Sequence, residues 1–93
     1  MKNLEKYIDN IEYVRNKINP IQMIITSSSI NLRKELRNGI IVAIIVRDEN
    51  EILKYEDFID NFNEDIDNVG VIFFLITKDN ASHDDEIVKG YIL

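Results

Sequence analysis

Hydroxyl and cationic residues follow three apolar runs of this 93-residue chain, and residues of these types can together bind an anion. Thr26 and three serines follow the first run, Arg47 follows the second and Lys78 follows the third. If the runs are parallel strands, their carboxyl ends meet at one edge of the sheet, where α/β proteins place ligands. The candidate anion- or ligand-binding residues are Ser27, Ser28, Ser29, Arg47 and Lys78.

Acidic residues follow the same runs, and the carboxylates of Asp48, Glu49 and Asp79 could instead hold magnesium. Ser, Asp and Asn also cap helices and form the turns that follow strands. The glycine-rich phosphate-binding patterns are absent, and no glycine lies between Met1 and Gly39. We therefore expect capping to be the main role of these residues, and the sequence assigns no metal ligand and no cofactor.

His83 is the only histidine, and Asp84, Asp85 and Glu86 follow it directly. A histidine beside carboxylates can act as a general base or as one ligand of a metal. A hydrolytic triad also needs a nucleophile in a recognisable setting, and zinc needs three or four ligands, whereas this chain has no cysteine. We expect His83 in an exposed loop or first helical turn, and we predict no catalytic residue.

Basic residues cluster once, as Arg33, Lys34 and Arg37, in a short helix predicted over residues 30–38. Three bases on one helix could neutralise a few phosphates and give a modest, salt-dependent affinity for RNA or DNA. The net charge of −6 opposes this, and no exposed aromatic residue interleaves the bases for stacking. RNA is therefore an alternative partner and not the favoured one.

The charges divide unevenly along the chain. Up to Arg47 there are eight bases and four acids, a net of +4, and from Asp48 onward there are thirteen acids and three bases, a net of −10. If folding preserves this division, the molecule has a basic side and an acidic side, which can steer association and set its register.

Hydrophobic spacing predicts the regular elements. Apolar residues from Leu4 to Ile18 repeat every 3.6 residues, which predicts a helix over 3–18 that Pro20 terminates. Residues 21–25 are predicted as a strand. Residues 40–46 and 69–76 are apolar throughout, apart from Gly70, which is typical of interior strands covered on both faces.

Two segments of the second half are predicted as helices. Tyr55, Phe58, Ile59 and Phe62 form the apolar stripe of the first, and outward carboxylates over 56–67 form its solvated face. Residues 52–55 could begin this helix, which we favour, or form a short antiparallel strand. The second helix is short and terminal, with Ile87, Val88, Tyr91 and Ile92 as its apolar residues.

The order α-β-α-β-α-β-α over residues 1–93 predicts a single α/β domain, built as a small two-layer or three-layer sandwich with a three-stranded, mainly parallel sheet. The alternative is an α+β fold in which 52–55 is an antiparallel strand. The N-terminal residues do not resemble a signal peptide, and the apolar runs are far shorter than the roughly 18 residues of a membrane helix. We expect a cytoplasmic protein with no membrane partner.

Two strands that need cover on both faces, in a chain with few elements to supply it, favour a non-enzymatic interaction or regulatory module. We expect it to form a homo-oligomer, such as a dimer, or to dock on a partner protein. One alternative is an RNA-associated accessory protein that uses the basic helix. A second is a small phosphate- or metal-dependent enzyme at the carboxyl edge of the strands.

Overall fold

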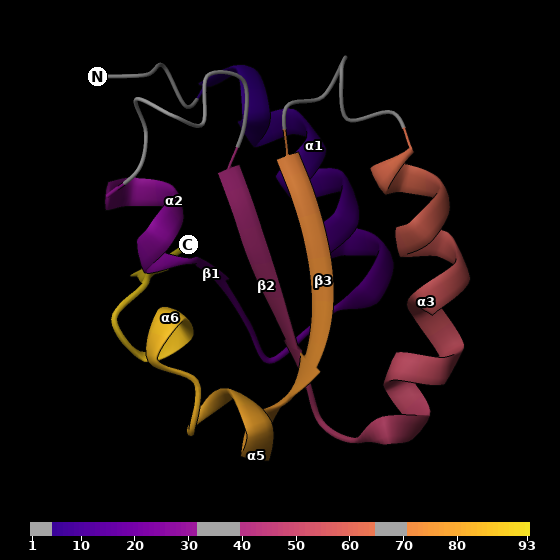
Figure 1. Ribbon diagram of the computed structural model, residues 1–93. Helices are drawn as coiled ribbons and strands as arrows, with labels where there is room; N and C mark the ends of the chain where they lie inside the picture. Colours follow the sequence, from indigo (N-terminus) through magenta and orange to yellow (C-terminus); the bar gives the residue numbers. More distant parts are fainter. Residues whose placement is uncertain (1–4, 32–39, 65–70) are drawn as a thin grey trace.

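Seven consecutive apolar residues form β2 (Ile40–Val46), the strand on which the sheet is built. In the computed structural model, which describes residues 5–31, 40–64 and 71–93, β2 pairs in parallel with β3 (Val71–Thr77) and antiparallel with β1 (Gln22–Ile25). The short strand β4 (Tyr91–Ile92) pairs antiparallel with the other side of β1. The chain therefore folds as a small mixed α/β domain whose sheet has the order β3-β2-β1-β4 (Figure 1).

Two long helices, α1 (Glu5–Ile18) and α3 (Glu49–Asn63), cover one face of the sheet (Figure 1). The buried residues between the helices and the sheet form the larger core. They are Tyr7, Ile11, Val14 and Ile18 of α1, Ile59 of α3, and Met23, Ile25, Ile40, Val42, Ile44, Val46, Val71 and Phe73 of the strands. β1, β2 and β3 contribute alternate residues because successive side chains of a strand point to opposite faces.

Two single-turn helices, α5 (Lys78–Ala81) and α6 (Asp85–Val88), cover part of the other face. Ala81 and Ile87 pack there on Ile24, Ala43 and Ile45. These short helices cover less area than α1 and α3 do. The prediction of cover on both faces is therefore confirmed for β2, whereas β3 lies at the sheet edge and leaves Ile72 42% exposed.

Capping residues define the starts of the helices in the second half of the chain. Asp48 precedes α3, and its side chain accepts a hydrogen bond from the Glu51 N–H at 3.1 Å. Thr77 and Asp84 cap α5 and α6 in the same way. Capping satisfies N–H groups that have no partner within the helix. Asp48 thus caps a helix, which is the role expected from its residue type and position.

The predicted three-stranded, mainly parallel sheet is wrong in the direction of β1 and in the number of strands. Alternating helices and strands give a parallel sheet only when each connecting helix crosses over the sheet. The described helix between β1 and β2, α2 (Ser27–Asn31), instead lies at the end of the sheet, where it contacts α6 and β2. The chain then enters β2 in the opposite direction to β1.

Three further predictions concern single segments of the chain. Residues 91–92 belong to a strand rather than to the predicted terminal helix. Residues 52–55 belong to α3, which confirms the favoured prediction of a helix there over the alternative of an antiparallel strand. The helix predicted over 30–38 begins earlier, at Ser27, and its residues from 32 onward lie outside the described residues. Arg33, Lys34 and Arg37 are among those residues.

Candidate functional site

The residues predicted to share an anion site lie at opposite ends of the sheet. Because β1 is antiparallel to β2 and β3, the serines that follow it lie near the start of β2, with Thr26 N–H donating to the Ile41 carbonyl. Arg47 and Lys78 follow the carboxyl ends of β2 and β3, at the far end. The expectation that all three strand ends meet is therefore wrong, and anion binding by any one of these residues stays a prediction.

The serines are engaged within the protein. The Glu86 carboxylate of α6 accepts hydrogen bonds from the Ser28 N–H at 2.7 Å and from the Ser27 hydroxyl at 3.1 Å. The Ser29 hydroxyl accepts from the Ile41 N–H at 2.8 Å. Hydrogen bonding by Ser28, through its side chain and its backbone, lowers the pKa of the Glu86 carboxyl below its ordinary value. A carboxylate of the chain itself thus caps α2.

Arg47 has a structural role. Its guanidinium forms an ion pair with the Glu51 carboxylate at 3.2 Å and donates to the Asn19 carbonyl at 3.3 Å. It therefore ties the start of α3 to the end of α1. Pro20 ends α1, and Asn19 has a positive φ of 55°, a conformation that Asn adopts more readily than most residues.

His83 is exposed in the turn between α5 and α6, as its sequence context predicts, and its backbone N–H donates to the Asn80 carbonyl at 3.2 Å. Among the described residues, no three His, Asp or Glu side chains are grouped so as to hold a metal ion. None of the helices in the described ranges has the length and apolar character needed to cross a bilayer.

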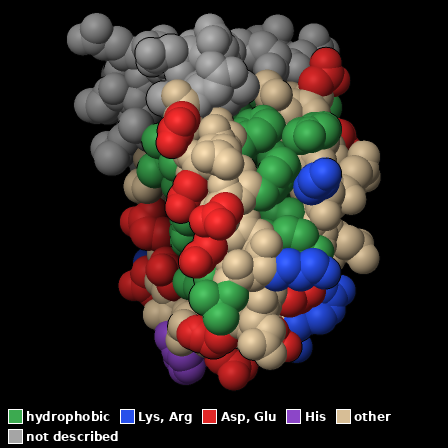
Figure 2. Space-filling view, turned by 90° about the vertical axis from the view of Figure 1, so that its right-hand side faces the viewer, with side chains coloured by type: hydrophobic (Ala, Val, Ile, Leu, Met, Phe, Trp, Pro, Cys, Tyr) green, Lys and Arg blue, Asp and Glu red, His purple; other side chains and the backbone are tan. Residues whose placement is uncertain are grey.

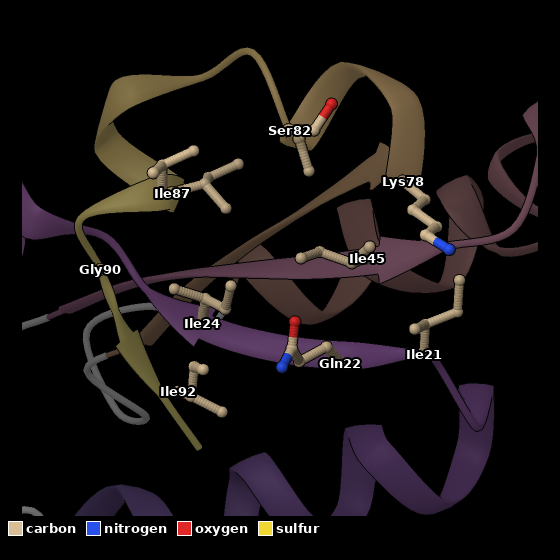
Figure 3. Close-up of a pocket in the computed structure, with 11 residues that line it drawn as sticks. Ile21, Gln22, Ile24, Ile45, Lys78, Ser82, Ile87, Gly90 and Ile92 are labelled. Atoms are coloured by element: carbon tan, nitrogen blue, oxygen red, sulfur yellow. The ribbon is translucent and has the colours of Figure 1, made fainter.

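An apolar groove lies between the α5–α6 segment and strands β1 and β4, with a volume of about 320 Å³ (Figure 3). Lys78 lies at one end of the groove and Ser82 at its upper rim in this view. The apolar residues that line it are Ile21, Ile24, Ile45, Ala81, Ile87, Val88 and Ile92. Its size is within the range of small binding sites, but it is open to solvent on the side of Ile92 and Val88.

The outer strand β4 leaves large apolar side chains in water. Tyr91 is 60% exposed and Ile92 is 63% exposed, and Val88 in the adjoining α6 is 62% exposed. Ile92 is opposite Ile24 and so shares the groove face, whereas Tyr91 is opposite Ile25 on the α1 face. We name the surface formed by Ile21, Val88, Tyr91 and Ile92 the β4 surface.

Gly90 allows β4 to approach β1 closely. A Cβ atom at this position would overlap the carbonyl oxygen of Ile25 and the Cγ2 atom of Ile24. The first of these atoms belongs to the backbone of a buried strand, which cannot move aside easily. Gly90 was the only sequence signal for the turn into β4, and the helical spacing of Ile87, Val88 and Tyr91 concealed it.

The opposite edge of the sheet is partly blocked. The Asn63 side chain, at the end of α3, donates to the Phe73 carbonyl at 2.7 Å and accepts from the Phe73 N–H at 2.9 Å. An amide side chain thereby occupies the hydrogen-bonding groups that a neighbouring strand would use. Edge strands are commonly protected in such ways against unwanted pairing. The two edges of this sheet therefore differ.

Comparisons of the chain with protein-family models, with curated proteins and with solved structures gave no match.

Proposed function

We propose that this protein is a non-enzymatic interaction module that self-associates or docks on a partner protein through the β4 surface. The observation that carries the proposal is the exposure of Val88, Tyr91 and Ile92, each more than half in water, on one edge strand and the helix before it, with Val88 and Ile92 beside the groove and Tyr91 on the α1 face. Large apolar side chains gathered on one edge in this way commonly mark a protein interface, whereas scattered apolar residues need no explanation.

The surroundings of the β4 surface support this proposal. The groove adds further apolar area beside Ile92, and burying apolar surface stabilises a complex by roughly 25 cal/mol per Å² before the losses of association are counted. Lys78 lines the groove, and Lys89 is the exposed residue that follows Val88 in the sequence. An apolar centre with a polar rim is the usual organisation of a protein interface.

The charge distribution favours association on one side of the module over the other. Figure 2 shows acidic side chains gathered over α3, with Lys and Arg side chains beside them at the lower right of this view. The exposed acids of α3 include Glu49, Glu56, Asp57 and Asp60. Their field repels other acidic surfaces, so association is favoured at surfaces away from α3.

The proposal is tested by size-exclusion chromatography with light scattering, together with pulldown, at low and high salt. The test variant is Tyr91→Asp, and the matched control is Leu53→Asp, which places the same charge at a 67% exposed position on α3. We expect wild type and the control to self-associate or retain the same partner, and Tyr91→Asp to lose this binding. A wild-type protein that stays monomeric at high concentration and retains no partner would contradict the proposal.

The same samples distinguish the alternatives. RNA binding that is strong at low salt, weak at high salt and abolished by changing Arg33, Lys34 and Arg37 to Glu would favour the nucleic-acid function. Thermal shifts with nucleotides or divalent ions would favour the small enzyme. No contact among the described residues favours either over the interaction module.

A further inference from the structure

We infer that the occupant of the β4 surface is a second copy of this chain, whose own β4 pairs antiparallel with it to join two four-stranded sheets into one. The inference rests on the proposed function and deepens it by naming the partner. It is carried by the hydrogen-bonding groups of β4, by the difference between the two sheet edges, and by the placement of charge.

The outer side of β4 presents the backbone of Ile92. Leu93 N–H donates to the Met23 carbonyl of β1 at 2.9 Å, so the backbone of Leu93 faces β1. Neighbouring residues of an antiparallel strand direct these groups to opposite sides, so the Ile92 N–H and C=O face away from β1. β4 is the last strand in the sheet order, and no strand of the described residues lies on that side.

This arrangement is complementary to itself. Two copies of β4 related by a two-fold axis can exchange both hydrogen bonds of an Ile92–Ile92 pair, which is what an isologous interface requires. Gly90 does not extend the pairing, because its N–H already donates to the Ile87 carbonyl at 2.9 Å. The pairing therefore centres on Ile92, and Tyr91 of each copy lies opposite Leu93 of the other.

The surface buried by strand pairing alone would be too small for a stable dimer. A stable dimer buries about 1,200–2,000 Å² in total, which a strand of a few residues does not supply. The exposed side chains of Ile21, Val88 and Tyr91 extend the contact on both faces of the strand, and the groove beside Ile92 accepts apolar groups from the other copy. The dimer thus covers the apolar residues that the monomer leaves in water.

The other edge of the sheet is a poorer site for association. At β3, the Asn63 amide already occupies both backbone groups of Phe73. α3 packs against this edge, and its exposed carboxylates face any molecule that approaches. Joining two copies there would bring two acidic helices together in a protein whose net charge is −6.

Joining through β4 keeps the two copies of α3 apart. β3 and β4 are the two ends of the sheet, so the β3 strands of the dimer are separated by seven strand spacings, about 33 Å. This is several times the Debye length of about 8 Å at physiological salt, so repulsion between the two copies of α3 is screened. Lys89 is the only charged residue in the segment 87–93.

Single cysteine variants test the register, because the chain contains no cysteine. The Cα atoms of an antiparallel hydrogen-bonded pair lie about 5.5 Å apart, which is within the range that a disulfide spans. Under mild oxidation we expect Ile92→Cys to form a covalent dimer at least tenfold faster than Ile72→Cys. The control residue is also a partly exposed isoleucine of an edge strand, but it lies on β3. Equal rates for the two variants would overturn the inference.

The oligomeric state of wild type and of Ile92→Asp completes the test, with the fold of each checked by circular dichroism. We expect a wild-type dimer and at least a tenfold higher dissociation constant for Ile92→Asp. A monomer that binds another protein through the β4 surface overturns the inference and leaves the proposed function standing. A dimer that Ile92→Asp leaves unchanged overturns the inference and also contradicts self-association through the β4 surface. A monomer without any partner overturns both.

Discussion

The side-chain amide of Asn63 pairs with both backbone groups of Phe73, with its nitrogen 2.7 Å from the carbonyl oxygen and its oxygen 2.9 Å from the amide nitrogen. Asn63 thus takes the place of a neighbouring strand at the β3 edge. Phe73 itself is buried, and its ring packs edge-on against that of Phe62, at a centroid distance of 5.5 Å. The hydrogen bonds of Asn63 and the ring contact of Phe62 therefore both hold the end of α3 against Phe73 of the sheet.

Asn63→Ala should destabilise the protein by about 1–3 kcal/mol, because it removes two partly buried hydrogen bonds. The measurement is the free energy of unfolding in urea. Asn61→Ala is the matched control, since Asn61 is an exposed residue of the same helix and should change stability by less than about 0.5 kcal/mol. Equal effects of the two variants would show that the pairing of Asn63 with Phe73 contributes nothing.

Gly90→Ala should displace β4 from β1. The added Cβ overlaps the backbone of Ile25, and strain of this kind typically destabilises a protein by about 1–3 kcal/mol. We expect the Leu93 amide, which donates to the Met23 carbonyl, to exchange its hydrogen faster in the variant. Lys89→Ala, at the exposed neighbouring position, should leave this exchange unchanged. A Leu93 amide that is equally protected in both variants would refute the steric argument.

The most hydrophobic elements could be predicted closely from the sequence. β2 spans residues 40–46, as predicted, because seven consecutive apolar residues can be buried only in the interior of the sheet. The apolar stripe of α1 and the Pro20 that follows it likewise predicted the end of that helix correctly, at Ile18. These predictions succeeded because the determining residues are local.

The direction of β1 and the existence of β4 could not be predicted in the same way. β1 pairs antiparallel with β2, with Ile25 opposite Val42, and no local pattern in the sequence specifies that direction. Tyr91 and Ile92 form a strand too short to show alternation, and their spacing from Ile87 and Val88 also fits a helix. The β4 surface was missed for this reason.

The predicted anion ligands lie at opposite ends of the sheet because β1 runs antiparallel to β2 and β3. Ser27, Ser28 and Ser29 would share an edge with Arg47 and Lys78 only if all strands were parallel. The long-range bond between Glu86 and Ser28 is also invisible to sequence spacing, because the two residues are 58 positions apart. Residue types indicated capping correctly, but they did not identify the capping partner.

Arg47→Ala should reduce stability only slightly. The guanidinium is about half exposed, and exposed ion pairs contribute about 0–1 kcal/mol, so we expect a loss in this range when the pair with Glu51 is removed. The loss of stability is measured by unfolding wild type and Arg47→Ala in urea at low and high salt. High salt should reduce the difference in unfolding free energy between the two proteins. A loss of several kcal/mol that salt does not change would instead assign Arg47 to a buried network.

The contact between α6 and α2 should depend on pH. Hydrogen bonds from Ser28 and Ser27 favour the ionised Glu86 carboxylate, and its pKa in the folded protein lies below the ordinary value of 4.5. A carboxyl whose pKa is lower in the folded than in the unfolded state stabilises the fold above the unfolded pKa. That contribution disappears as the pH falls from about 4.5 through the lower, folded pKa.

Glu86→Gln should therefore reduce the free energy of unfolding near neutral pH and bring it closer to that of wild type below the folded pKa of Glu86. The matched control is Glu56→Gln, which removes an exposed carboxylate from α3. Unfolding measured over a series of pH values, together with an NMR titration of the Glu86 side chain, gives both quantities. If the stability difference between wild type and Glu86→Gln were constant from neutral pH to below pH 4.5, the hydrogen bonds from Ser28 and Ser27 would not depend on the charge of Glu86.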